Sequence, residues 1–310
     1  MTTLPQTFRY AFGGYVLDTN IYLPELQPTI EMADCSIMVN ATIPDGVDHA
    51  TLELPFYHNH ETNLLQLKYE KGWIFVKHNK HIEFIPNEVM DEAMLRIYIL
   101  GTVLAVMSVA LNFFPFHASA VVINGKAVLF CGASGVGKST LAAYFYSKKY
   151  TILSEDVTNV KMSANGKYVA YPSLQRIKLS SSGLNLIGAD ETGLDTIPLK
   201  KHKFSYPINL NTATAAYPLG AFVFLQFNGD KPVFKMNLTA ESKIRLNRFL
   251  FRKRITKNVY DGTYKNANLF NIALNHNSYV FSRPNNEYAM AENCKFIEDK
   301  LLVAIEDKLI

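Results

Sequence analysis

The sequence has few cysteines and little net charge, and both shortages narrow what the protein can be. Its three cysteines, Cys35, Cys131 and Cys294, are widely spread over 310 residues and form no Cys-x-x-Cys pair. An odd, scattered set predicts neither a disulfide framework nor a zinc site, and it fits a reducing cytoplasm best. The formal net charge of +4, from 31 basic and 27 acidic residues, indicates no nucleic-acid partner, although it suits an acidic ligand such as a nucleotide.

The first residues, MTTLPQTFRY, also lack the basic segment, apolar run and small-residue cleavage site of a signal peptide. One stretch, Ile97 to Phe116, carries no charge over about the length needed to cross a bilayer. It contains Gly101, Asn112 and Pro115 and leads straight into a strand-like segment, so a buried core helix fits it better. We therefore expect a cytoplasmic protein without a membrane span.

The order of the segments predicts two domains. Up to residue 85, short runs rich in β-branched and aromatic residues alternate with polar turns, which is typical of strands. Pro86-Asn87 ends this pattern, and Glu88 to Leu111 has the composition of a long helix. We place the boundary here, with residues 1–88 as a β-rich N-terminal domain and residues 89–310 as a second domain.

In the second domain, predicted helices and strands are mixed. Ala118 to Ile123 and Ala127 to Phe130 predict a hairpin, because Asn124-Gly125 between them favours the positive φ angles of a tight turn. Thr239 to Phe251 and Glu287 to Leu309 predict helices. The predicted fold class is therefore mixed α/β, with substantial antiparallel content in the second domain.

A glycine-rich motif after the second strand of this hairpin gives the strongest chemical signal. It matches the GxxxxGK[ST] pattern of a phosphate-binding loop, or P-loop, between an apolar strand and a helix-like run. In such a loop several backbone N–H groups and the positive end of the helix attract phosphate oxygens. Lys138 would reach the β- and γ-phosphates, and the Ser139 hydroxyl would bind Mg²⁺. The predicted nucleotide-binding residues are Gly132, Ala133, Ser134, Gly135, Val136, Gly137, Lys138, Ser139 and Thr140.

Two acids follow the next strand-like run, Thr151 to Leu153, in the sequence Ser154-Glu155-Asp156. Strands that neighbour a P-loop strand end on the side of the loop, so this position is expected beside the γ-phosphate. A carboxylate there can coordinate Mg²⁺ or accept a proton from an incoming hydroxyl. An exposed acidic turn is the plain alternative.

Taken in order, the segment Phe116-His117-Ala118-Ser119-Ala120, the hairpin, GASGVGKST and SED resemble the catalytic core of HPr kinase/phosphorylase. In that family a histidine precedes the P-loop and a pair of acids follows it. The resemblance implies an HPr kinase-like P-loop domain that uses ATP and Mg²⁺. It implies that Asp156 is the base for a serine proton, that Glu155, in place of the usual first aspartate, meets the metal with Asp156, and that His117 lies near them. Without this resemblance, His117 would be interpreted as a core histidine.

Beyond about residue 160 the sequence departs from HPr kinase itself, because the family's later magnesium-binding glutamate and its arginine-containing loop have no clear counterpart. Around that place stands PSLQRIKL, from Pro172 to Leu179. The chain is more similar here to HPr kinase-like proteins of peptide natural-product pathways, including kinases that phosphorylate the C-terminal serine of lasso peptide precursors. This similarity implies a peptide or protein substrate that carries a serine.

Basic residues offer candidate substrate contacts. Arg176 and Lys178 alternate on a strand-like segment and would face one side, where they could hold a γ-phosphate or an acidic substrate. Arg245, Arg248 and Arg252 share one helical face by their spacing, where they could bind a peptide carboxylate. Ordinary solvated charges are an equal alternative for Arg176 and Lys178, and a solvated helix face is the better explanation of the three arginines.

Three functions stay open on these observations. The first is an ATP-dependent serine kinase acting on a peptide or protein. The second is a P-loop kinase for a small molecule, and the third is a nucleotide-sensing protein without transfer activity. The sequence leaves the substrate and the oligomeric state open, a homo-oligomer included.

Overall fold

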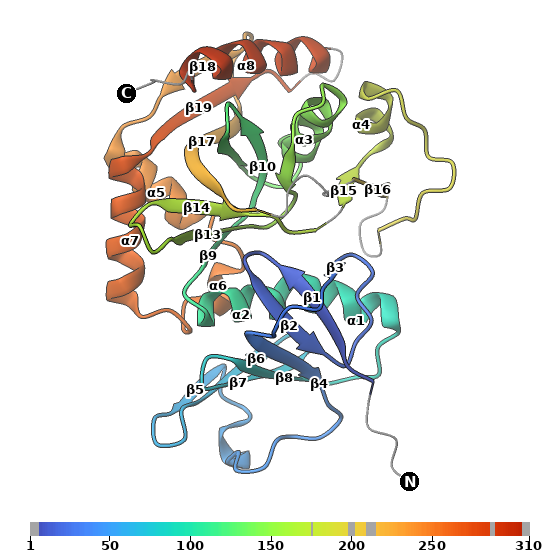
Figure 1. The fold of residues 1–310 in the computed structure, drawn as a ribbon, viewed down its shortest axis with the longest axis vertical. Coiled ribbons are helices and arrows are strands. Elements are labelled where there is room, and N and C mark those ends of the chain that lie inside the picture. Colours follow the sequence, from blue (N-terminus) through green and yellow to red (C-terminus); the bar gives the residue numbers. More distant parts are fainter. Residues whose placement is uncertain (1–5, 175, 198–201, 209–214, 286–288, 306–310) are drawn as a thin grey trace. The chain divides into compact units, whose positions relative to one another are not determined.

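The computed structural model describes residues 6–174, 176–197, 202–208, 215–285 and 289–305 (Figure 1). Its contacts divide the chain into two compact units, Met1–Phe113 with Arg252–Gly262, and Phe114–Phe251 with Thr263–Ile310. Both units combine helices and strands, so the mixed α/β class predicted from the sequence is confirmed.

The N-terminal unit is built on an eight-stranded sheet with the order β3-β1-β2-β4-β8-β7-β6-β5. Its last strands form antiparallel hairpins, as the polar turns between them predict. Glycine is required at Gly72, where φ is +147° and a Cβ atom would lie 2.0 Å from the Ile85 carbonyl oxygen. The strands are β1 (Phe8–Phe12), β2 (Tyr15–Thr19), β3 (Gln27–Pro28), β4 (Cys35–Val39), β5 (Phe56–Asn59), β6 (Leu64–Tyr69), β7 (Gly72–Lys77) and β8 (His81–Pro86).

A helical stretch from Glu92 to Ala110 completes this unit. It consists of α1 (Glu92–Tyr98), a π-helical turn (Ile99–Val103) and α2 (Leu104–Ala110). By length and composition alone it could cross a membrane, but 67% of its most apolar window is buried inside the structure. It therefore packs as the core helix that the sequence predicts.

The contacts of this helix explain why the division differs from a boundary after residue 88. Tyr15 on β2 and Ser108 on α2 share a hydrogen bond of 3.1 Å between their hydroxyl oxygens, so the helix is fixed to the N-terminal sheet. Residues 252–262, with α6 (Lys253–Thr256), return to the same unit, and Tyr260 donates a hydrogen bond to the Phe113 carbonyl oxygen. The helix belongs to the N-terminal unit because its apolar side chains are buried there. The sequence pattern shows only where the N-terminal strands end, so it places the boundary too early.

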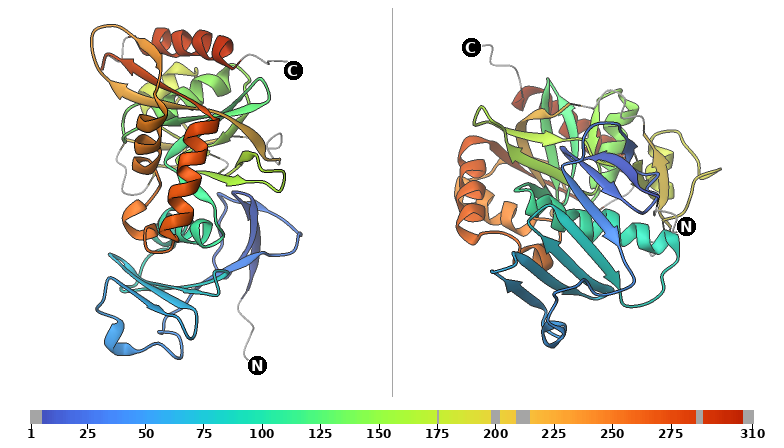
Figure 2. Two further views of the ribbon diagram at one scale, coloured as in Figure 1. Left: turned by 90° about the vertical axis from the view of Figure 1, so that its left-hand side faces the viewer. Right: turned by 60° about the horizontal axis from the view of Figure 1, so that its bottom comes forward.

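The second unit is built on a nine-stranded sheet that mixes parallel and antiparallel pairs (Figure 2). The long strand β17 runs parallel to β11 on one side and to β19 on the other. On the far side of β11 the order continues through β10 to β12. The strands are β9 (Phe114–Phe116), β10 (Ala118–Ile123), β11 (Lys126–Cys131), β12 (Ile152–Ser154), β13 (Thr158–Met162), β14 (Tyr168–Tyr171), β17 (Tyr217–Phe227), β18 (Val233–Met236) and β19 (Asn277–Arg283). A separate ribbon pairs β15 (Arg176–Leu179) with β16 (Phe204–Pro207).

Helices cover both faces of this sheet. On one face α3 packs through Phe145, whose ring stacks on Phe130 of β11. On the other face Phe249, just after α5, stacks on Phe224 of β17. The helices are α3 (Lys138–Ser147), α4 (Ser181–Leu186), α5 (Thr239–Arg248), α7 (Gly262–Asn275) and α8 (Met290–Ala304). The predicted helices 239–251 and 287–309 are thus found in shorter form, and residues 287–288 and 306–309 lie outside the described part.

Candidate active site

The glycine-rich segment 132–137 connects the end of β11 to the start of α3. Gly135 and Gly137 have φ angles of +86° and +104°, which favour glycine. A Cβ atom on Gly132 would lie 2.6 Å from the Val136 side chain, so the backbone is tightly folded. The tightly folded loop therefore leads directly into the N-terminus of α3. There, unpaired backbone N–H groups and the helix dipole favour the binding of an anion.

Lys138 folds back over this loop. Its side chain is buried, with the residue 7% exposed, and its ammonium donates hydrogen bonds to the carbonyl oxygens of Gly132 (2.9 Å) and Ala133 (3.1 Å). Burial lowers the pKa of Lys138, while Asp156 and Glu155 act in the opposite direction. The ammonium thus lies within the loop, where phosphate oxygens could replace the carbonyl oxygens as its acceptors.

Strand register brings three segments to one edge of the sheet. Strand β10 lies between β11 and β12 and is antiparallel to both, with Ala118 opposite Cys131 and Ala120 opposite Ser154. The start of β10 therefore lies beside the ends of its neighbours. His117, which precedes β10, and the acids that follow β12 are consequently near the loop that follows β11.

Glu155 links this edge to the loop. Ser139 Oγ donates a hydrogen bond of 2.6 Å to Glu155 Oε1, and Glu155 is only 3% exposed. Its other oxygen, Oε2, is buried without a hydrogen-bond partner. Burial raises the pKa of Glu155, and the neighbouring Asp156 adds to the shift, whereas Lys178 and the Ser139 hydrogen bond lower it.

These groups fit a Mg²⁺ ion. A hydroxyl oxygen and a buried carboxylate oxygen without a partner are hard oxygen donors of the kind Mg²⁺ prefers. Among the described residues, no three His, Cys, Asp or Glu side chains are grouped as a metal site. A Mg²⁺ ion held mainly by Ser139 and Glu155 would fill its remaining positions with phosphate oxygens and water, as this ion commonly does.

Asp156 lies between the ammonium of Lys178 and the imidazole ring of His117, which come from distant parts of the sequence. Its Oδ2 is 2.5 Å from Lys178 Nζ, and its Oδ1 is 3.4 Å from His117 Nε2. Its backbone is in the left-handed region, with φ of +74°, a conformation that costs free energy and often marks functional sites. The structure thus brings together Asp156, His117 and Lys178, all predicted as site residues.

Both the backbone and the ring of His117 have contacts that fix its position. Its N–H donates to the Phe249 carbonyl oxygen at 2.8 Å, and its ring lies edge-on to Phe251 at 5.8 Å between centroids. The side chain is 29% exposed. Its partial exposure and its distance to Asp156 distinguish it from a core histidine with only structural contacts.

The β15–β16 ribbon carries a basic face. Arg176 and Lys178 are half-buried, while Ile177 and Leu179 between and after them are buried, so the two cations share one side, as predicted. The pairing of Leu179 with Phe204 places Lys203 on this same side. Gln175, in the predicted PSLQRIKL stretch, lies outside the described residues.

Lys203 is a site residue that sequence reasoning missed. Its positive charge lowers the pKa of both Lys138 and Glu155, so it lies within electrostatic reach of the loop and the acids. Only the pairing of β15 with β16 would have revealed it, since Lys203 stands 47 residues after Asp156 in a stretch of the sequence that is rich in basic residues.

The predicted row of three arginines is wrong. Helix α5 ends at Arg248, and Arg252 stands outside it with a left-handed φ of +51° in the other unit. Arg245 is half-buried with its guanidinium 5.7 Å from the centre of the Phe224 ring, and Arg248 is exposed. Two arginines thus remain on the helix, beside a strand whose Phe224 pairs with Cys131 at the start of the loop.

A second residue missed from the sequence, Arg283, contacts the loop directly. It ends β19, and its Nη2 donates a hydrogen bond of 3.1 Å to the Val136 carbonyl oxygen. Its Nη1 donates to the Pro284 carbonyl oxygen, and the guanidinium lies 4.8 Å from the centre of the Phe227 ring. Burial lowers the pKa of Arg283. Strand pairing between distant segments creates this contact, so no local motif predicts it.

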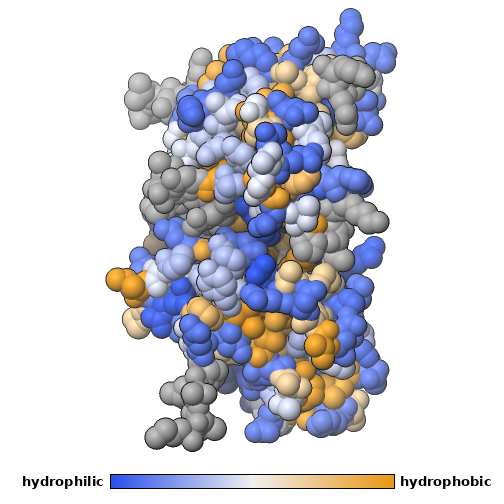
Figure 3. Space-filling view, turned by 90° about the vertical axis from the view of Figure 1, so that its right-hand side faces the viewer, coloured by the Kyte–Doolittle hydropathy of each residue, from blue (hydrophilic) through white to orange (hydrophobic). Residues whose placement is uncertain are grey.

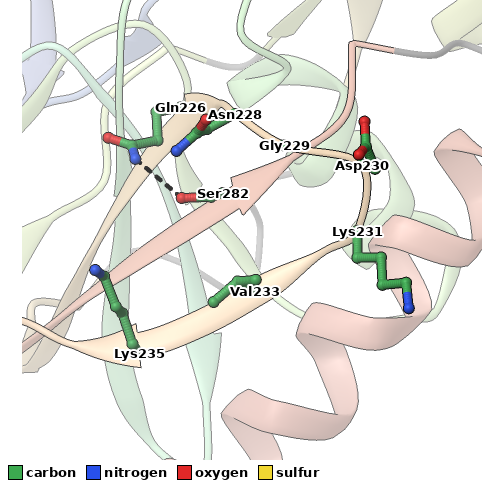
Figure 4. Close-up of a pocket in the computed structure, with 8 residues that line it drawn as sticks. All are labelled: Gln226, Asn228, Gly229, Asp230, Lys231, Val233, Lys235 and Ser282. Atoms are coloured by element: carbon green, nitrogen blue, oxygen red, sulfur yellow. Dashed lines mark hydrogen bonds between the residues drawn. The ribbon is translucent and has the colours of Figure 1, made fainter.

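An open pocket of about 410 Å³ lies at the turn between β17 and β18 (Figure 4). Gln226 Nε2 donates to Ser282 Oγ at 2.9 Å across the neighbouring strands. Because side chains alternate along a strand, Gln226 and Phe227 point to opposite faces, so this pocket opens on the face away from Arg283. The lining residues are Gln226, Asn228, Gly229, Asp230, Lys231, Val233, Lys235 and Ser282.

Comparison with known proteins adds one finding. Neither a family model nor a curated protein matches this sequence. Among solved structures, the HPr(Ser) kinase/phosphatase from Coxiella burnetii matches with a TM-score of 0.32 and 13% sequence identity, over 61% of this chain and 97% of that one. This chain is therefore similar to that enzyme, at a level that carries no argument about mechanism or substrate.

Proposed function

We propose that this protein is an ATP-dependent kinase that transfers the γ-phosphate to a serine hydroxyl of a peptide or protein in the cytoplasm. The observation that supports this proposal most strongly is the position of Asp156. It lies between His117 and Lys178, at the sheet edge that also holds the glycine-rich loop. The contact between Ser139 and Glu155 joins the acids to the loop. Together these groups provide an anion site with an acid pair at one end.

The nucleotide phosphates would lie against residues 132–140. Backbone N–H groups of the loop and of the first turn of α3 would bind their oxygens, and Thr140 would add a hydroxyl. Lys138 would turn from the carbonyl oxygens of Gly132 and Ala133 to the β- and γ-phosphates. This exchange breaks no ion pair, because the ammonium leaves neutral carbonyl oxygens and gains anionic phosphate oxygens as its acceptors.

Mg²⁺, when bound to Ser139 and Glu155, would neutralise part of the charge on the transferred phosphate. The remaining steps use the protein's own groups. The acceptor oxygen attacks the γ-phosphorus as the bond to the β–γ bridging oxygen breaks, and ADP leaves with the bonding electrons. Asp156 would accept the proton that the hydroxyl loses, and Lys178 would stabilise charge on the phosphoryl oxygens. The products are the phosphorylated serine, ADP and a proton.

Basic residues beyond the acids favour a peptide acceptor with negative charge near the serine. Arg176, Lys178 and Lys203 share one face of the β15–β16 ribbon, and Arg245 and Arg248 lie on α5. A carboxylate at the end of a peptide would suit such cations, as in a lasso peptide precursor with a terminal serine.

The N-terminal unit, taken by itself, has a surface of a different kind, with exposed apolar groups. On the face shown in Figure 3, its hydrophobic side chains gather between hydrophilic ones. Large exposed hydrophobic residues of this unit include Tyr22, Ile30, Met32, Leu54 and Val89. Exposed apolar groups of this kind suit an extended chain better than a free amino acid.

The test is phosphate transfer to defined acceptors. Purified protein with ATP and Mg²⁺ is offered a precursor peptide ending in serine, the same peptide ending in alanine, and free serine, and products are measured by mass spectrometry. We expect a mass gain of one or more phosphates on the serine peptide alone. Transfer to free serine or a metabolite would indicate a small-molecule kinase. Nucleotide binding with no transfer to any acceptor would indicate a nucleotide-sensing protein.

A further inference from the structure

We propose that the carboxyl ends of β17 and β19 bind the nucleoside of the nucleotide, with the base stacked on the Phe227–Arg283 pair and the ribose against Asn293. This inference rests on the proposed nucleotide binding and deepens it, because it assigns the part of the ligand that the loop leaves unbound. All the residues involved belong to the second unit.

The strand order sets the direction of the bound nucleotide. The acids follow β12, on one side of the loop strand β11, whereas β17 and β19 lie on its other side. The transferred phosphate must be near the acids, so the α-phosphate and the nucleoside leave the loop toward β17 and β19. Strands β17 and β19 both continue past the point where the loop begins. Phe224 of β17 pairs with Cys131, the last residue before the loop, and β17 then continues to Phe227, which lies opposite Arg283.

Phe227 and Arg283 form a stacking surface at this place. The Phe227 side chain is 40% exposed, and the Arg283 guanidinium lies 4.8 Å from its ring centre. Arg283 is also fixed to the loop through the Val136 carbonyl oxygen. An aromatic ring or guanidinium plane beside a phosphate site binds a base by stacking, with little preference among bases. The pair is therefore placed to receive the base directly after the phosphates.

A buried polar group without a partner provides an independent indication of a ligand. Asn293 on α8 is 4% exposed, and its Nδ2 donor has no hydrogen-bond partner. It lines a cavity of about 10 Å³, with room for about one water molecule or one hydroxyl group, together with Thr140 of the first turn of α3 and Arg283. A buried donor that stays unpaired is costly, so a polar atom is expected to meet it. A ribose hydroxyl next to the α-phosphate provides such an acceptor.

A purely structural role for Arg283 would give a different pattern of binding. Its hydrogen bond to Val136 and its closeness to Gly137, where a Cβ atom would lie 2.8 Å from Nη2, stabilise the loop that holds the phosphates. A loss of Arg283 would therefore weaken every phosphate ligand, with or without a base. The Phe227 ring packs on Arg283 and has no hydrogen-bonding group with which to hold the loop, so changes to Phe227 separate stacking from loop support.

The experiment measures dissociation constants for Mg²⁺–ATP and for Mg²⁺–triphosphate, the inorganic ion, by calorimetry. Variants are Phe227→Ala, Phe227→Trp and the control Phe270→Ala, since Phe270 is also exposed and also lies beside a cation, Lys243. We expect Phe227→Ala to weaken ATP binding by about 10-fold and triphosphate binding by less than about 2-fold. Phe227→Trp and Phe270→Ala should bind both ligands like the wild type.

Unchanged ATP affinity in Phe227→Ala, or equal loss of both ligands with an unchanged melting temperature, would overturn the proposal. If the wild type binds triphosphate as tightly as ATP, the nucleoside has no site and the proposal falls while the phosphate loop stands. If the wild type binds neither ligand, the proposed function fails as well.

Discussion

The two sides of the glycine-rich loop differ in the kind of contact they offer. On the acid side, after β12, both carboxylates make close polar contacts: Asp156 Oδ2 lies 2.5 Å from the Lys178 ammonium, and Glu155 Oε1 accepts a 2.6 Å hydrogen bond from the Ser139 hydroxyl. On the arginine side, at the end of β19, Arg283 contacts backbone carbonyl oxygens and an aromatic ring. Paired charges suit proton and phosphoryl transfer, whereas stacking and backbone contacts suit binding. On the proposed function, this difference predicts that phosphate transfer and nucleotide affinity can be separated by mutation.

The largest effect is expected for Lys138, because both the acid side and the arginine side of the loop depend on it. Lys138→Ala removes the only loop cation that can follow the β- and γ-phosphates among the described residues, so transfer should fall by about 10³-fold or more. Phosphate transfer to the acceptor is measured at saturating ATP, with Lys148→Ala, directly after the same helix, as the control. Unchanged turnover in Lys138→Ala would refute the role of the loop.

A smaller effect, confined to binding, is expected on the arginine side. Arg283→Lys keeps the charge but loses the fork that contacts both Val136 and Pro284, so the KM for ATP should rise by about 10-fold with kcat within about 2-fold. Steady-state kinetics give both constants. A variant that loses kcat and keeps its KM would remove the distinction between the two sides.

The acid side should also respond to pH. Burial raises the pKa of Glu155, so protonation at falling pH removes a Mg²⁺ ligand and weakens Mg²⁺-dependent ATP binding. Lys178 lowers this pKa, so in Lys178→Met the weakening should begin at a higher pH than in the wild type. Binding is titrated with Mg²⁺ from pH 5 to pH 8, beside the control Lys148→Met. A shift in the opposite direction would show that Lys178 does not act on Glu155.

Sequence reasoning succeeds where neighbours in space are also near in sequence. The strand, loop and helix around Gly132 to Ser139 follow from local pattern, and the Asn124-Gly125 turn, with φ of +48° and +71°, is present as predicted. The acids stand at the expected sheet edge, although β10 separates their strand from β11. Local signals were sufficient for these features because each depends on one turn or one short connection.

The features that were missed depend on distant pairing or on tertiary packing. Arg283 and Lys203 reach the loop and the acids through β19 and β16, whose partners no local pattern identifies. Arg252 leaves its helix because the backbone turns left-handed there, which a repeat of arginines does not reveal. The apolar helix 92–110 groups with the first unit because its packing partners are there.

The central claim, that Asp156 acts in transfer and not in binding, is tested most directly by Asp156→Asn. The amide keeps the size of the side chain but cannot accept the proton as a carboxylate does, so kcat should fall by about 10²-fold while the dissociation constant of Mg²⁺–ATP stays within a few-fold. Single-turnover transfer and ATP binding are measured on one preparation, with Asp190→Asn as an exposed control. Asp156→Asn with most of its kcat would contradict the account and make Glu155 the next candidate for the base.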